Sequence, residues 1–344
     1  MVVQSLPPGQ FTVTNTVAVL NKLELIQEGA VARYGPGGFR WLSTVGDLSA
    51  MYDEIDPALA CDKAEEAISY LPEWTGRRSA SWLNMSYRGG LVSWGKANRD
   101  NRVNVDFARL MQMCRFDCAN TLYKFCGKVN RRKFGVPMGG FMSPALAILC
   151  CGMIEFEMEH LGGLVGFVVR YMDDVFGTYA VGDDAEAEQV SKYFGKVAVS
   201  YPPPLVLNVE PVSDSHRFLE LVINTAGGSF SCHLWNPVVR ALRGGERVLL
   251  RMPSVGGGTT KRDRLSLLVG AVYRMVQGCY TPRDLMLSVV EMSVEFVLST
   301  CSNSLSLVRM ALYRVSKATE KDTNARVKLL SETLMGLYWM LSGL

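Results

Sequence analysis

The sequence lacks a hydrophobic run long enough to span a membrane. Of its 344 residues 48% are hydrophobic, yet the longest apolar stretch, residues 145–154, is short and interrupted by Gly152. A transmembrane helix needs about 20 apolar residues. The first eight residues also lack the basic start and the apolar core of a secretory signal peptide. We therefore expect an intracellular protein, in the cytoplasm or the nucleus, with no membrane partner.

Histidine is scarce and cysteine is scattered. The chain has three histidines and nine cysteines, an odd number, with Cys150 and Cys151 adjacent inside an apolar segment. This pattern favours reduced, mostly buried thiols over a disulfide framework. Cys114 and Cys118 have neither a second cysteine pair of matching spacing nor a histidine nearby, so a zinc site is not expected.

Charge is present in ordinary amount but unevenly placed. Residues 217–344 carry 16 Lys and Arg against 9 Asp and Glu, a net +7, so the remainder of this +3 chain is −4. An acidic N-terminal region and a basic C-terminal region fit a metal-using site beside a surface that binds a polyanion. Chance asymmetry on an ordinary surface is the alternative.

The first half of the chain alternates strand and helix signals. We expect a strand at 41–48 and a helix from Pro57 to about residue 71, capped by Asp56. Residues 73–104 give no clear assignment. The spacing then predicts a helix at 105–122, a basic hairpin at 123–134, a loop at 135–142 and a buried helix at 143–160.

The second half changes from mixed structure to helices alone. Two apolar runs, 166–171 and 175–180, predict strands that meet at Asp173 and Asp174. Asp183 and Asp184 can cap a helix to about residue 199, followed by a strand at 205–209 and a hairpin of 217–224 with 229–235. After residue 255 the pattern predicts three or four helices. This order indicates an α+β domain with a helical domain behind it.

The strongest chemical signal is the segment 170–176, Arg-Tyr-Met-Asp-Asp-Val-Phe. Two adjacent carboxylates at the tip of a buried hairpin concentrate negative charge, which a pair of Mg²⁺ ions would neutralise. An ordinary aspartate-rich turn is the alternative.

A glycine-rich loop lies about 30 residues upstream, at 135–144, Gly-Val-Pro-Met-Gly-Gly-Phe-Met-Ser-Pro. Glycines let a ligand approach the backbone closely, and Ser143 with Pro144 predicts an N-cap and the first residue of a helix. The position of this loop, shortly before the aspartate pair, suits a surface that contacts template and nucleotide. An ordinary loop before a core helix, which has the same composition, is the alternative.

Together these segments resemble motifs B and C of reverse transcriptases. The likeness is greatest to Penelope-like retroelements, which carry Gly-x-x-Met-Gly, Ser-Pro and then Arg-Tyr-x-Asp-Asp. Upstream, Asp47, Ser49 and Tyr52 resemble motif A, and residues 217–221, with Phe218 and Leu219, resemble the primer-grip hairpin. The resemblance covers about residues 10–235.

The resemblance implies a right-hand polymerase of α+β class. Its palm would be a split βαβ arrangement, an RRM-like antiparallel sheet with helices on one face, with truncated fingers and an α-helical C-terminal thumb. The implied domains are a remnant of the fingers at 1–40, the palm at 41–235 with an insertion at about 73–134, and the thumb at 236–344. The missing fingers would come from another chain or from a longer protein, or be replaced by Arg40 and the Arg77–Arg78 segment.

The resemblance also implies site residues. Three carboxylates would hold two Mg²⁺ ions, with Mn²⁺ as a substitute: Asp47, Asp173 and the supporting Asp174. The nucleotide would contact Leu48, Tyr52, Met138, Gly139 and Tyr171. Template and primer would contact Gly140, Ser143, Lys128, Arg131, Arg132, Lys133, Phe218 and Leu219. For the basic hairpin a solvated face is the alternative.

The implied activity is RNA-directed DNA synthesis onto a primer 3′-hydroxyl. Its partners would be an RNA template, a nucleic-acid primer and nucleoside triphosphates. Tyr52 favours a DNA product, since an aromatic ring under the sugar excludes a 2′-hydroxyl; a core tyrosine is the alternative. Two other functions stay open: a viral RNA-dependent RNA polymerase with a similar palm, and a truncated or domesticated relative that binds nucleic acid without catalysis.

Overall fold

A computed structural model describes residues 10–74, 82–86, 92–97, 101–137, 140–158, 160–246, 258–300 and 305–342. The chain divides into two compact units, each described here by itself. The sheet unit comprises Met1–Val13, Thr44–Thr178 and Asp183–Pro211. The helical unit comprises Thr14–Ser43, Tyr179–Gly182 and Val212–Leu344.

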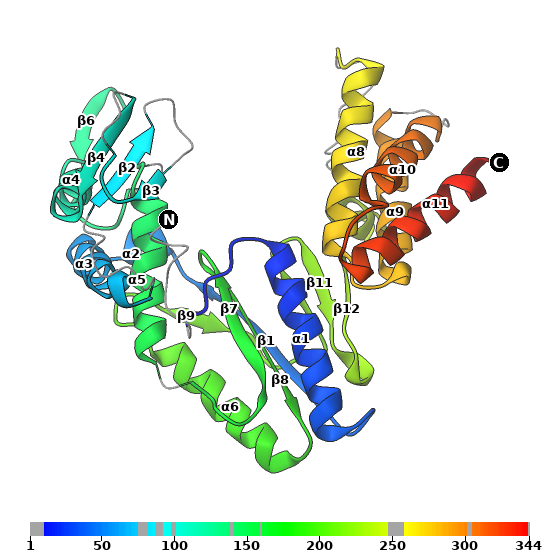
Figure 1. Ribbon diagram of the computed structural model, residues 1–344, viewed down its shortest axis with the longest axis horizontal. Helices are drawn as coiled ribbons and strands as arrows, with labels where there is room; N and C mark the ends of the chain where they lie inside the picture. Colours follow the sequence, from blue (N-terminus) through cyan, green and yellow to red (C-terminus); the bar gives the residue numbers. More distant parts are fainter. Residues whose placement is uncertain are drawn as a thin grey trace. The chain divides into compact units, whose positions relative to one another are not determined.

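Most of a four-stranded sheet of order β7-β8-β1-β9 belongs to the sheet unit (Figure 1). Its strands are β1 (Arg40–Leu48), β7 (Val165–Tyr171), β8 (Asp174–Val181) and β9 (Leu207–Val209). β1 and β9 are antiparallel, with Asp47 opposite Asn208. A parallel bridge from Thr12 to Arg170 adds the N-terminal segment beside β7. The strands predicted at 41–48, 166–171, 175–180 and 205–209 are confirmed.

Helices α2 (Met51–Glu54), α3 (Pro57–Trp74), α5 (Ser143–Glu157) and α6 (Asp184–Val199) belong to the same unit. α6 packs closely on β8, because a Cβ at Gly177 would lie 2.6 Å from the Phe194 ring. Asp183 caps α6 as predicted, accepting a hydrogen bond from the Glu186 amide at 2.8 Å. The predicted N-cap of α5 is wrong: Met142 occupies the cap position and Ser143 is the first helical residue.

The insertion between α3 and α5 has its own strands. β2 (Trp82–Ser86), β3 (Val92–Trp94) and β4 (Arg102–Asp106) pair in the order β3-β2-β4, followed by α4 (Phe107–Ala119). The predicted helix at 105–122 therefore starts later, because Val105 pairs with Leu83 in the sheet and Asp106 caps α4. The basic hairpin is confirmed as β5 (Leu122–Phe125) and β6 (Lys128–Arg131).

The helical unit combines α1 (Thr16–Tyr34) with a three-stranded sheet and C-terminal helices. Its strands are β10 (Ser215–Phe218), β11 (Leu221–Asn224) and β12 (Ser231–Leu234). Short α7 (Pro237–Arg243) precedes α8 (Lys261–Gly278), α9 (Pro282–Thr300), α10 (Ser306–Thr319) and α11 (Ala325–Ser342). The structure describes four helices after residue 255, where three or four were expected. They bury a common apolar core that includes Leu268, Leu285 and Leu312. In the described part of the chain, each helix is too short or too polar to cross a membrane.

Candidate active site

Backbone pairing joins the end of β1 to the turn between β7 and β8. The Leu48 amide donates a hydrogen bond to the Asp173 carbonyl at 2.9 Å. One residue later, the Ser49 amide donates to the Val206 carbonyl at 3.1 Å, just before β9. These bonds fix Asp47, which precedes the buried Leu48, beside Asp173 although the two are far apart in the sequence.

The charges of this region influence one another. Partial burial and the negative charge of Asp173 raise the pKa of Asp47 above its ordinary value. Burial and the same Asp173 charge raise the pKa of the Tyr52 phenol. Since a carboxylate disfavours a second negative charge only over a short range in protein, Asp47, Tyr52 and Asp173 form one electrostatic cluster. α2 supplies Tyr52 to it.

The turn that carries Asp173 has a strained residue. Met172 adopts a left-handed conformation, with φ 56°, which non-glycine residues seldom take. Its carbonyl accepts a hydrogen bond from Arg170 Nη1 at 2.7 Å, which holds the turn. Around it, Tyr171 is exposed at the end of β7, and Asp174 is half-buried at the start of β8.

Arg170 belongs to a buried polar network that the sequence did not predict. Its guanidinium pairs with Glu155 of α5, and both side chains are fully buried. Tyr201 Oη donates to Glu155 Oε1 at 2.9 Å, and the Phe11 amide donates to Glu155 Oε2 at 2.9 Å. Burial and the Glu155 charge raise the pKa of Tyr201, so it stays a donor. The available signal was a single Arg in an apolar strand and two Glu near the end of an apolar helix.

The glycine-rich loop is attached to α2. The Val136 amide donates to the Tyr52 carbonyl at 2.8 Å. Gly135 has φ +79°, and a Cβ there would lie 2.7 Å from the Tyr52 and Asp53 carbonyl oxygens. Only glycine fits this approach, so the loop and Tyr52 are held in one arrangement.

The rest of the predicted loop is less fully described. Met138 and Gly139 lie outside the described residues. The Gly140 amide donates to the Pro137 carbonyl at 3.0 Å, closing a turn. Ser143 is fully buried, and its hydroxyl has no hydrogen-bond partner among the residues that the structure describes. The contacts of these four residues with nucleotide or template stay predictions.

The basic hairpin presents cations of two kinds. Lys128, Arg131 and Lys133 are exposed, although Arg131 donates to the Ala119 carbonyl through Nε at 2.9 Å. Arg132 is half-buried and pairs with Asp53 of α2. The lysines are therefore the side chains best placed to meet a phosphate, whereas Arg132 ties the hairpin to the helix that carries Tyr52.

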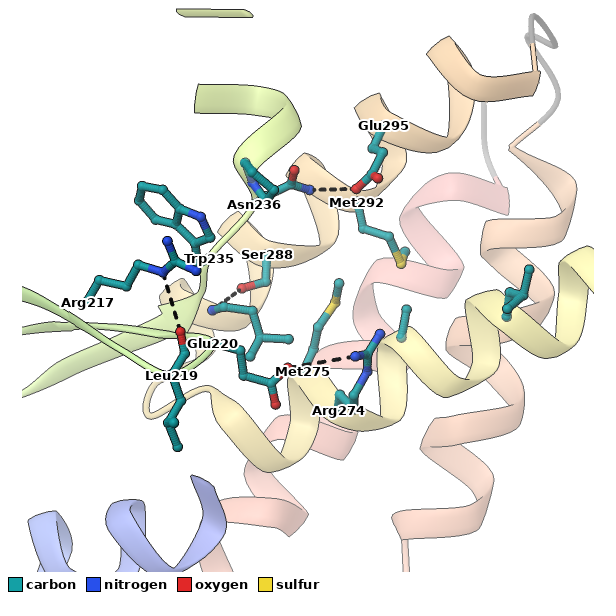
Figure 2. Close-up of a pocket in the computed structure, with 14 residues that line it drawn as sticks. Arg217, Leu219, Glu220, Trp235, Asn236, Arg274, Met275, Ser288, Met292 and Glu295 are labelled. Carbon is teal, nitrogen blue, oxygen red and sulfur yellow. Dashed lines mark hydrogen bonds and ion pairs between the residues drawn. The ribbon is translucent and has the colours of Figure 1, made fainter. Parts of the chain in front are cut away.

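Phe218 and Leu219 belong to the helical unit, at the turn from β10 to β11. Phe218 is 1% exposed, and Leu219 is left-handed with φ 56°. Beside this turn lies a pocket of about 660 Å³ (Figure 2). Figure 2 shows the Arg217 guanidinium against Trp235, with its Nε donating to the Leu219 carbonyl at 3.4 Å. Arg217 and Arg240 lie 4.9 and 4.7 Å from the centre of the Trp235 ring.

The carboxylate pair fits a divalent cation. Within the described ranges no three His, Cys, Asp or Glu side chains are placed to hold one metal ion. Asp47 and Asp173 nevertheless supply oxygen donors, which Mg²⁺ prefers, and their mutual repulsion would fall on binding a cation. The role of Asp174 as a supporting ligand stays a prediction.

Comparisons with known proteins place the fold. No protein-family model and no curated protein matches the sequence. One similar solved structure is a telomerase from Candida albicans in complex with a TWJ fragment of telomeric RNA. The alignment covers 99% of this chain and 51% of the telomerase chain, with TM-score 0.58 and 15% identity. An apo telomerase from Candida tropicalis matches 100% of this chain and 48% of its own, with TM-score 0.49 and 14% identity.

Another match is the BmCPV RNA-dependent RNA polymerase at its elongation state. The alignment covers 94% of this chain and 25% of the polymerase chain, with TM-score 0.39 and 14% identity. The chain thus spans about half the length of the two telomerases. Over nearly its whole length, this mixed α/β chain therefore has a fold similar to that of the Candida albicans telomerase.

Proposed function

We propose that the chain is an RNA-directed DNA polymerase that extends a nucleic-acid primer on an RNA template. The observation that supports the proposal is the hydrogen bond from the Leu48 amide to the Asp173 carbonyl at 2.9 Å, which makes the backbones of the two motif aspartates neighbours. The resemblance of the motifs to Penelope-like retroelements supports a retroelement origin, and the sheet unit would serve as the palm.

In this proposal Asp47 and Asp173 hold the divalent cations, with Asp174 in support. When bound, these ions lower the pKa of the primer hydroxyl and neutralise the triphosphate. Leu48 and Tyr52 lie at the nucleotide sugar, and the Tyr52 ring leaves no room for a 2′-hydroxyl. The glycine loop, together with the cations of the basic hairpin, supports the template and the primer.

Primer extension on an RNA template tests the proposal. We expect the wild-type chain to add nucleotides with Mg²⁺ or Mn²⁺, and Asp47→Asn or Asp173→Asn to lose at least about a hundredfold in rate. The reason is that each removes a charge worth several kcal/mol to a bound metal. Glu188→Gln is the matched control, because Glu188 forms only an exposed ion pair with Lys192 on α6.

The outcomes separate the alternatives. Near-normal extension by either aspartate variant, with the fold intact, overturns the assignment of the site. Preference for ribonucleotides on the same template identifies an RNA polymerase. Binding of RNA without Mg²⁺ and without extension, unchanged by Asp173→Asn, identifies a non-catalytic relative.

A further inference from the structure

The sheet unit also has a cavity whose lining includes neither Asp47 nor Asp173. It measures about 650 Å³ and is lined by the start of α3, the end of α4 and residues 131–134. Its arginines are already engaged: Arg115 pairs with Glu65 at 2.5 Å, Arg131 bonds the Ala119 carbonyl and Arg132 pairs with Asp53. The arginines of this cavity are therefore held by protein partners, and Lys133 is the further cation in its lining.

Two thiols also line this cavity, Cys61 from α3 and Cys118 from α4. They come from two helices that pack against each other, and the Cys118 thiol influences the ionisation of Cys61. Cys61 is 3% exposed and Cys118 is half-buried, so both border the cavity without lying on the open surface.

The surroundings favour a thiolate on Cys61. The Cys118 thiol and the positive charge of Arg115 lower the pKa of Cys61. Burial and the negative charges of Asp62 and Glu65 oppose them, and the net effect is a lowered pKa. The neighbouring Cys114 differs, because burial and the charge of Cys61 raise its pKa to about 11. A thiolate beside a second thiol, open to a cavity, is the arrangement of an oxidisable pair.

We propose that Cys61 and Cys118 form a peroxide-sensitive dithiol that closes to a disulfide between α3 and α4. The Cys61 thiolate attacks one oxygen of hydrogen peroxide: an S–O bond forms, the O–O bond breaks, and hydroxide leaves and takes a proton to become water. The Cys118 thiol then attacks the Cys61 sulfur: the S–S bond forms, the S–O bond breaks, and the departing hydroxide takes the Cys118 proton and leaves as a second water. Two thiols and one peroxide thus give one disulfide and two waters.

Its consequence concerns the insertion. α3 follows directly on α2, which carries Tyr52, whereas α4 lies within the insertion. The disulfide therefore ties the insertion covalently to the part of the sheet unit nearest the carboxylates. This chemistry requires no polymerase activity, so it is tested independently of the proposed function.

The test treats the purified full chain with increasing hydrogen peroxide, blocks the remaining thiols and maps the peptides by mass spectrometry. We expect a linked peptide pair containing Cys61 and Cys118, lighter by two hydrogens and restored by dithiothreitol. Cys61→Ser or Cys118→Ser abolishes the linked pair. Cys126→Ser is the matched control and retains it, because Cys126 is exposed on the β5–β6 turn.

Timed alkylation of the untreated wild-type chain gives a measurement that needs no variant. We expect iodoacetamide to modify Cys61 at least several times faster than the buried Cys150 and Cys151, whose pKa values are raised by burial. The proposal is overturned if peroxide links other cysteines instead, if it gives only over-oxidised Cys61, or if Cys61 alkylates no faster than these two.

Discussion

At the scale of single residues, the buried pair of Arg170 and Glu155 decides how Asp173 is presented. Arg170 bonds the carbonyl of Met172, and Glu155 in turn holds Arg170, Tyr201 and the Phe11 amide. A charge removed from such a pair leaves its partner buried and uncompensated. The turn therefore depends on residues that never face a ligand.

We predict that Glu155→Gln lowers the free energy of unfolding by about 3–5 kcal/mol, because Arg170 would remain charged and buried. Denaturant unfolding measures the change. Glu188→Gln is the control, since its ion pair with Lys192 is exposed and worth at most about 0.5 kcal/mol. An equal decrease in the free energy of unfolding for the two substitutions would show that the buried pair stabilises the fold no more than the exposed one.

Tyr52 is the residue on which the choice of sugar depends. Its ring lies within the field of Asp173 and its carbonyl is fixed by Val136. We predict that Tyr52→Ala raises ribonucleotide incorporation relative to deoxynucleotide incorporation by about tenfold or more, the effect of removing a clash worth about 1.4 kcal/mol. Single-nucleotide extension with each triphosphate measures the ratio, with Tyr52→Phe as the control. If the ratio of ribonucleotide to deoxynucleotide incorporation is unchanged in Tyr52→Ala, Tyr52 does not exclude the 2′-hydroxyl.

At the scale of elements, positions of strands and helices followed from apolar spacing and caps. Asp183 capping α6 and the paired runs of β7 and β8 are examples. The strands of residues 82–106 escaped prediction, because that stretch is rich in Gly, Ser, Arg and Asn and because β2 also pairs with β4, beyond the intervening β3.

The candidate site was predictable in part. The motif spacing led to Asp47, Tyr52 and Asp173, which the structure brings together. The left-handed Met172 and the partner of Arg170 could not be found from sequence, because each depends on contacts between distant segments.

The docking of the glycine loop on α2 gives a prediction for that element. Gly135→Ala should cost about 1–3 kcal/mol more than Gly127→Ala, because an added methyl meets backbone oxygens at 2.7 Å. Gly127 is a matched control: its φ is +78° against +79°, but nothing lies within 4 Å of its Cβ position. Thermal or denaturant unfolding of both variants measures the difference. An equal loss of stability in the two variants would mean that the loop moves to accommodate the added methyl group.

At the scale of the whole molecule, charge is the property that bears on a polyanionic partner. The region 217–344 carries a net +7, and the basic hairpin adds exposed lysines in the sheet unit. Counterion release makes phosphate binding weaken as salt rises. Affinity for a primer–template duplex should therefore fall steeply with salt.

We predict that replacing Lys128 and Lys133 by Ala makes the slope of log affinity against log salt less negative by about 2, since each lost phosphate contact changes it by about 0.9. Fluorescence anisotropy at several salt concentrations measures the slope. Lys192→Ala is the control, because Lys192 pairs with Glu188 on α6. A slope unaltered by the double substitution would mean that the hairpin face is merely solvated.

The short bridge between Thr12 and Arg170 sets a practical boundary for shortening the protein. The Arg170 amide donates to the Phe11 carbonyl at 2.6 Å, and the Val13 amide donates to the Arg170 carbonyl at 2.8 Å. A chain trimmed to begin at Thr14 would lose the hydrogen-bond partners of β7. It would also lose the Phe11 amide, which donates a hydrogen bond to Glu155. An expression product cut there would expose an unprotected strand edge and tend to aggregate, whereas one that retains residues 10–13 keeps the edge covered.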